Sequence, residues 1–258
     1  MFFVKNRFKN KRKKRFFTIN ILFLSLFIFF FVYLYSSFNK FTDITSYLVQ
    51  EYSNKYNYNL EKIEVFGLKN INKTEILLTL NKFKNYSVFL IPVKKISDEI
   101  KKNKWIHEVN IRNDYKNTLT VNIKEEIPMG IFENNNQRIL FSNNLVVLEI
   151  LDNNHDFKNL IIFYGENSIN YSKNLILNID QDIIRMIKTA TFIENRRWNI
   201  KLKNNIVLKL PEINIKRAIE NYKKIYSNLS NKDLKDIEII DLRIPNQAII
   251  KYRNTEND

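Results

Sequence analysis

The residue types that carry out most catalytic chemistry are few and scattered in this chain. It has only two histidines, His107 and His155, and neither has a second metal-ligating residue at the spacing of a known zinc motif. The absence of cysteine excludes a disulfide framework, a cysteine nucleophile and a Cys-ligated cluster. Asp180 and Asp182 stand where a helix is expected to begin, so capping accounts for them. We therefore expect no enzyme activity, no metal site and no cofactor.

One serine motif requires a separate explanation. Ser37 and Lys40 match the S-x-x-K pattern of serine acyl enzymes, but the companion S-D-N and K-T-G motifs are missing. The chain also lacks a G-x-S-x-G nucleophile motif and a phosphate-binding G-x-x-x-x-G-K loop. An extracytoplasmic hydrolase therefore remains only as an alternative that would need carboxylates to converge in the folded chain.

Residues 16–38, FFTINILFLSLFIFFFVYLYSSF, carry no charge. As a helix they would rise about 34 Å, enough to cross a hydrocarbon core of roughly 30 Å. A cleaved signal peptide is the alternative, but its apolar core would be shorter, and the sequence around Ser36-Ser37-Phe38 is a poor cleavage site. The sequence predicts a single transmembrane helix.

The tail of residues 1–15 contains basic residues and no acidic ones, and it ends in Lys11, Arg12, Lys13, Lys14 and Arg15. Basic residues beside a span stay on the cytoplasmic side, so these five set the topology, with the N-terminus inside and residues 39–258 outside. The tail accounts for much of the formal net charge of +15, which leaves no charge argument for binding nucleic acid.

Beyond the span, the periodicity predicts a small α+β unit. A strand is expected at 61–65, and the capping-box pattern of Asn72 and Glu75 begins a helix. A second helix follows Pro92. Two strands then pair through a turn at 113–117, and their expected faces are Trp105, His107, Val109 and Ile111 on one, and Leu119, Val121 and Ile123 on the other. The order is β-α-α-β-β.

The rest of the chain reads as a β-rich domain with two helices. One or two strands are expected within 139–150, a hairpin across 198–210, and a last strand over 237–253 that is interrupted near Pro245. The helices are expected at 180–194 and 213–229. Residues 39–58 continue the first helix or form a spacer.

Several separated motifs resemble one family. IEVFG at 63–67, KTEI at 73–76, WIHEVNIR at 105–112 and TLTVNIKEEIP at 118–128 resemble a POTRA domain of the FtsQ type. QRIL from 137, FIENRRWNIKLKNNIVLKLP at 192–211 and IEIIDLR at 237–243 resemble the strands that follow in the FtsQ/DivIB family. The resemblance covers nearly the whole chain. It implies a cytoplasmic tail (1–15), a transmembrane helix (16–38), a spacer (39–58), a POTRA domain (59–127), an FtsQ-type β domain (128–253) and a polar tail (254–258).

The resemblance also implies a function. It suggests a non-catalytic scaffold at the division septum of the bacterial inner membrane, with its C-terminal domain in the periplasm. FtsB-like and FtsL-like partners would bind by strand addition at the C-terminal sheet edge, and other early division proteins would bind through the POTRA domain. An envelope-assembly factor that carries a POTRA domain is the alternative.

The resemblance assigns partner binding to Arg243, Ile244 and Tyr252. Arg243 matches the arginine of the family's DLR motif, Ile244 stands where an aromatic residue is frequent, and Tyr252 matches a C-terminal aromatic. Two structural alternatives stay open. Arg243 would instead pair with Asp241 or Glu238, and Tyr252 would pack in the core or along the edge.

Overall fold

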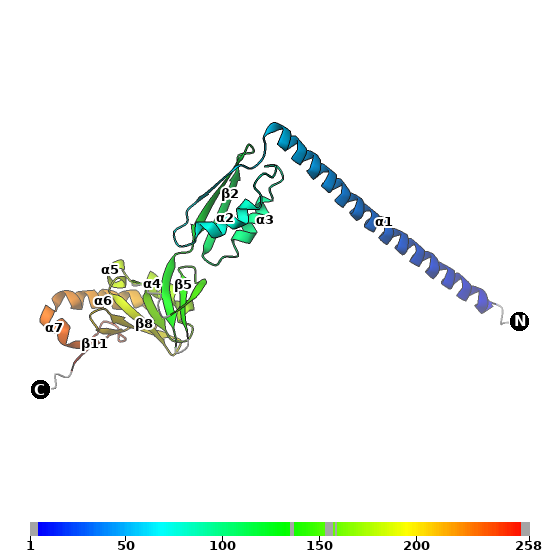
Figure 1. Cartoon of the computed structure of the whole chain (residues 1–258). Helices are drawn as coiled ribbons and strands as arrows, with labels where there is room; N and C mark the ends of the chain where they lie inside the picture. The colour runs from blue at the N-terminus through cyan, green and yellow to red at the C-terminus, as the bar shows by residue number, and fades with distance from the viewer. Residues whose placement is uncertain (1–4, 135–136, 153–156, 158, 254–258) are drawn as a thin grey trace. The chain divides into compact units, whose positions relative to one another are not determined.

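The computed structural model describes residues 5–134, 137–152, 157 and 159–253 (Figure 1). Within these, it leaves the side chains of residues 5–22, 34, 36–40 and 231–233 outside its description. The chain divides into two compact units, Met1–Phe66 with Lys73–Ser97 and Asn110–Asn122, and Gly67–Asn72 with Asp98–Val109 and Ile123–Asp258.

The chain begins with one long helix, α1 (Lys5–Tyr56). Residues 39–56 are part of it, so most of the expected spacer is helical. Its last turns bind their own unit through Gln50, whose Oε1 accepts the Ser87 N–H at 2.8 Å, and through Ser53, whose buried hydroxyl lies 2.7 Å from that of Ser87. Asn57 then adopts a left-handed conformation (φ 60°), which ends the helix.

The backbone of residues 16–38, for which a membrane span is predicted, is helical throughout. Within the described part of the chain, we find no helix with a stretch both long and apolar enough to cross a membrane. The transmembrane assignment stays a prediction.

The β-α-α-β-β order is confirmed. The strands β1 (Lys62–Phe66), β2 (Ile106–Asn113) and β3 (Thr118–Glu125) form a sheet in the order β1-β3-β2, with helices α2 (Lys73–Asn81) and α3 (Val93–Ile100) between β1 and β2 in the chain. β1 runs parallel to β3, with Val65 opposite Val121. The turn between β2 and β3 forms because the Asp114 carboxylate accepts the N–H groups of the three residues from 116 to 118.

The expected face of β2 is only partly as predicted. Val109 is buried and Trp105 and Ile111 are half-buried, but His107 is exposed and its neighbour Ile106 is buried instead. The regular alternation fails because the strand starts directly from a turn, in which Ile106 N–H donates to the Asn103 carbonyl. His107 then turns toward Glu126 instead of the core.

A second, mixed sheet has nine strands in the order β12-β11-β10-β9-β8-β7-β4-β5-β6. Their bounds are β4 (Pro128–Glu133), β5 (Arg138–Ser142), β6 (Val147–Leu151), β7 (Ile161–Tyr164), β8 (Ile187–Ile193), β9 (Arg197–Leu202), β10 (Val207–Lys209), β11 (Ile237–Asp241) and β12 (Ile249–Tyr252). The pairs β4–β7, β7–β8 and β10–β11 are parallel, so each needs a crossover connection. Strands β5 and β6 lie in the first, helices α4 (Ser168–Leu177) and α5 (Gln181–Ile184) in the second, and α6 (Ile215–Asn228) and α7 (Asn231–Asp236) in the third.

Three expectations for this domain are confirmed. Residues 139–150 give the two strands β5 and β6, residues 198–210 give the hairpin of β9 and β10, and α6 (Ile215–Asn228) forms within the expected range 213–229. The inward face of α6 is also as expected, with Ile215, Ala218, Ile219 and Tyr222 buried.

Three other expectations are wrong. The helix expected at 180–194 ends at Ile184, because residues 187–193 form β8, which is paired on both sides by β7 and β9. The described domain holds four helices instead of two, since α4 and α7 gave no clear periodic signal. The last strand is two antiparallel strands, because the chain reverses near Pro245 and brings β12 back along β11.

The core under the large sheet is aromatic and aliphatic. Phe163 packs edge-on against Phe141 and Trp198, at ring distances of 5.4 and 5.9 Å. Ile237, Ile240 and Leu242 are almost fully buried and hold β11 in this core. β11 therefore provides a fixed support for β12, the strand at the edge.

Candidate functional site

The candidate site is the open edge of the large sheet. Within the described part of the chain, β12 pairs with β11 alone, with Ile240 opposite Ile250 and Asp241 opposite Ile249. Ile250 packs against the core, while Ile249 and Tyr252 are 57% and 53% exposed. An unpaired edge with exposed apolar side chains is the type of surface to which a partner strand adds.

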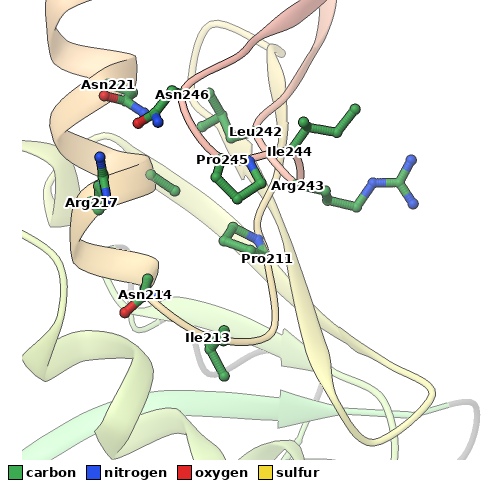
Figure 2. Close-up of a pocket in the computed structure, with 11 residues that line it drawn as sticks. Pro211, Ile213, Asn214, Arg217, Asn221, Leu242, Arg243, Ile244, Pro245 and Asn246 are labelled. Atoms are coloured by element: carbon green, nitrogen blue, oxygen red, sulfur yellow. The ribbon is translucent and has the colours of Figure 1, made fainter.

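A hollow lies beside this edge, between the first turns of α6 and the connection from β11 to β12 (Figure 2). Its empty space is ≈ 510 Å³, which includes open solvent. Pro211, Ile213, Ala218, Leu242, Ile244 and Pro245 give it apolar walls. The polar groups are Asn214, Arg217, Asn221, Arg243 and Asn246. The hollow can therefore take an apolar side chain with a polar or acidic neighbour.

Arg243 makes a two-pronged ion pair with Asp241. Its Nε and Nη2 lie 2.8 and 2.6 Å from the two carboxylate oxygens. Hydrogen bonds from this guanidinium are the main reason that the pKa of Asp241 lies below its ordinary value. Of the two structural alternatives for Arg243, the ion pair with Asp241 is the one formed, because Glu238 pairs with Lys251 at 2.7 Å.

The pair still leaves Arg243 able to bind a partner. Its side chain is 41% exposed, whereas that of Asp241 is only 15% exposed. Arginine has five N–H donors, and among the described residues the Nη1 nitrogen has no acceptor.

Arg217 is a second cation of the hollow that sequence reasoning missed. It lies in the first turn of α6, is exposed, and has no ion-pair partner among the described residues. The sequence could have indicated Arg217, because it stands directly before Ala218 and Ile219, which face inward. An exposed arginine in the N-terminal turn of a helix favours an acidic group.

The structure brings together two of the three predicted partner residues. Arg243 and Ile244 both line the hollow, and Ile244 is 47% exposed. Tyr252 does not line it, but lies at the end of β12 opposite Ile237. Its exposure excludes the core-packing alternative. The predicted topology residues, Lys11 to Arg15, lie in α1, and their side chains are outside the described residues.

The other candidate chemical groups form local structural pairs. His107 Nδ1 lies 3.0 Å from Glu126, whose second oxygen accepts the Asn144 amide at 2.9 Å. Burial raises the pKa of Glu126, but hydrogen bonds from Ser142, Asn144 and His107 together bring it below its ordinary value. His155 lies outside the described residues.

Asp180 does not cap α5 with its side chain, contrary to expectation. Asp180 and Asp182 instead lie 2.8 and 3.2 Å from Lys223 of α6. This ion pair ties two crossover helices together. Among the described residues, no group of three histidine or acidic side chains could hold a metal ion.

The β-α-α-β-β unit and the nine-stranded mixed sheet that follows it define an α+β protein of the POTRA-bearing class. Residues 58–126 match the POTRA domain, FtsQ-type, and residues 130–243 match the cell division protein FtsQ/DivIB, C-terminal.

Several similar proteins share one name, cell division protein FtsQ. That of Rickettsia felis is 31% identical over 240 residues, which cover 90% of this chain and 87% of the relative. That of Rickettsia conorii is 30% identical over 79% of this chain and 76% of its own length. That of Agrobacterium fabrum is 24% identical over 80% of this chain and 65% of its own. The chain belongs to the FtsQ/DivIB family of cell division proteins.

Proposed function

We propose that this protein is a non-catalytic scaffold at the division site. It binds an FtsB-like protein, itself paired with an FtsL-like protein, and helps to recruit or regulate septal peptidoglycan synthesis. Family membership supports a role in division. The observation that carries the binding proposal is β12, an unpaired edge strand next to a hollow with two arginines.

In this proposal the partner adds a strand along β12, and main-chain hydrogen bonds set its register. Ile249 and Tyr252 provide the exposed apolar contacts. An acidic residue of the partner binds Arg243, which it shares with Asp241. An arginine anchor of this type contributes about 1–3 kcal/mol when the contact excludes water.

We also propose the membrane topology. Residues 16–38 form one span of the inner membrane, with the basic tail in the cytoplasm and both folded domains in the periplasm. The uncharged stretch and the cluster from Lys11 to Arg15 support this arrangement. The POTRA domain contacts earlier division proteins and contributes to septal placement.

The binding proposal is tested with the detergent-purified full chain and the ectodomains of FtsB-like and FtsL-like proteins. Arg243→Ala and Tyr252→Ala should each weaken binding about tenfold, the effect of roughly 1.4 kcal/mol. Arg196→Ala is the matched control, because Arg196 makes a similar exposed pair with Glu194, two residues away in another hairpin. Unchanged affinity in both test variants would exclude the β12 edge as the binding site.

The division-site proposal is tested by the position of a fluorescent fusion in dividing cells. A band at midcell is expected. An even distribution around the cell would instead favour an envelope-assembly factor.

A further inference from the structure

The large sheet has a second open edge, at the strand β6. Within the described part of the chain, β6 pairs with β5 alone, just as β12 pairs with β11 alone at the other end of the sheet. Ile150 of β6 is 65% exposed, although it lies in one row with Ile139 and Phe132, which packs against the large core. An open strand edge with an exposed apolar side chain favours the addition of another strand.

The two open edges carry opposite charges. β6 and the residue after it hold Glu149 and Asp152 and no basic residue, whereas β12 and the residue after it hold Lys251 and Arg253 and no acidic one. Two β6 edges, or two β12 edges, would bring like charges together along one seam, which is destabilising between paired strands. The charges therefore favour β6 of one chain beside β12 of another.

The strand directions determine how a second copy continues the sheet. From β6 to β12, five neighbouring pairs are antiparallel, namely β6–β5, β5–β4, β8–β9, β9–β10 and β11–β12, and the other three are parallel. Because five is an odd number, β12 runs opposite to β6. A second copy placed beside the first in the same orientation, with its core on the same face, therefore presents β12 antiparallel to β6. This arrangement also keeps all membrane-anchored copies the same way up.

One antiparallel register matches both the faces and the charges of the two strands. Ile250 packs against the large core and Ile150 lies on the same face, so these two side chains stand opposite each other. Glu149 and Lys251, each the next residue in its strand, then meet on the other face. A shift by one residue would put Ile150 opposite Lys251. Lys251 Nζ lies 2.7 Å from Glu238, but its side chain is 61% exposed and has donors for a second carboxylate.

We propose that β6 of one chain adds to β12 of a second copy of this chain, antiparallel and in this register, so that one sheet continues into the next. The contact joins two different surfaces, so it is head-to-tail and extends to a row of copies. It is short, because β6 bulges at Leu148, and it depends on the high local concentration that the proposed membrane anchor gives.

The contact would also regulate partner binding, a consequence that rests on the proposed function. β12 is the edge to which the FtsB-like partner is proposed to add, and one strand edge accepts one new strand. A second copy and the partner therefore compete for β12, and partner binding shortens the row.

Two single-cysteine chains test the contact in membranes. The natural chain has no cysteine, so Glu149→Cys and Lys251→Cys each introduce a unique thiol at one edge. Chains with different tags, expressed together, should form a mixed disulfide at twice the chain mass of 31.2 kDa. This band should be about tenfold stronger than the dimer of either variant alone, since a disulfide needs Cβ atoms within about 4.5 Å. An equally strong dimer from one variant alone would mean a two-fold contact or random collision, and would overturn the proposal.

A second substitution shows whether β6 itself makes the contact. Ile150→Asp in the Glu149→Cys chain should remove the mixed band, whereas Ile150→Val should keep it. Leu177→Asp is the matched control, because Leu177 is 76% exposed and lies in α4, away from both edge strands. The same band from the Ile150→Asp and Leu177→Asp chains would exclude β6 as the contact.

An FtsB-like protein in the same membranes separates the two proposals. It should weaken the mixed band several-fold, and a band that persists while this protein is bound would refute shared use of β12. A mixed band without any FtsB-like binding refutes the proposed function and leaves the sheet contact standing. Binding of the FtsB-like protein by a chain that never forms the mixed band refutes the sheet contact and leaves the proposed function standing.

Discussion

Two loops hold a charged side chain in opposite ways. In the first, residues 67–71, the Glu125 carboxylate is almost fully buried and accepts four N–H groups. These are the backbone N–H groups of Lys69, Asn70 and Ile71 and the side-chain amide of Asn70, at 2.7 to 3.1 Å. In the second, residues 241–246, Arg243 is half exposed and forms an ion pair with Asp241.

The buried Glu125 carboxylate stabilises its own loop, whereas the exposed Arg243 guanidinium can still bind a group of another molecule. Burial raises the pKa of Glu125, but the N–H groups of the loop together bring it below its ordinary value. With its acceptor sites occupied, the carboxylate has little left to offer a ligand, and it fixes the loop. Arg243 keeps donors and solvent access, so a competing carboxylate can reach it.

The largest effect is expected from Gly67→Ala in the first loop. Gly67 has φ +88°, and an added Cβ would lie 1.9 Å from the Ile123 carbonyl oxygen. The strained backbone and this clash should together lower the free energy of unfolding by about 2–4 kcal/mol. Urea unfolding measures it, with Lys69→Ala as the control, because that side chain is exposed and its N–H remains. Equal stability of the two variants would contradict the role of Gly67.

Glu125→Gln should destabilise the protein by about 1–3 kcal/mol, because a neutral amide has one oxygen to accept several buried N–H groups. Binding of the FtsB-like partner by the folded fraction should stay unchanged. Unfolding curves and binding isotherms on one preparation give both values. A loss of affinity with normal stability would reverse the proposed distinction between the loops.

Arg243→Ala should show the reverse pattern. Its exposed pair with Asp241 contributes at most about 1 kcal/mol to stability, while the partner contact contributes about as much or more to binding. Thermal unfolding should therefore change by only a few degrees at most. If the variant loses more stability than Glu125→Gln, Arg243 is a structural residue.

The smallest effect is expected in the pH dependence of stability. Glu125 has a folded pKa below its ordinary value of 4.5, so its contribution is complete above that pH and is lost as the pH falls through the folded pKa. Unfolding free energies measured between pH 6 and 3 should fall less steeply in Glu125→Gln than in the natural chain. Arg196→Ala, in contrast, should leave the Glu125 contribution intact.

The sequence predicted elements best where one local signal was clear. The turn at 113–117 and the hairpin around Asn204-Asn205 formed as expected, because turn chemistry is local. For residues 187–193 the sequence predicted a helix, because their apolar residues fit a helix as well as a strand. They form the strand β8 because β7 and β9 pair with them on both sides. Arg217 was missed because it lines the same hollow as Arg243 only when α6 packs beside the β11–β12 connection.

Local periodicity and residue type in the sequence were enough to predict the β-α-α-β-β unit, because these signals need no distant partner. The resemblance to the family's motifs singled out Arg243 and Tyr252 in the C-terminal segment as candidate partner residues. The folded chain was needed to show that residues 237–252 form two strands, that β12 is the edge of the described sheet, and that Arg217 lines the same hollow as Arg243. Such facts depend on contacts between residues far apart in the chain, and no local pattern encodes which strand is left without a neighbour.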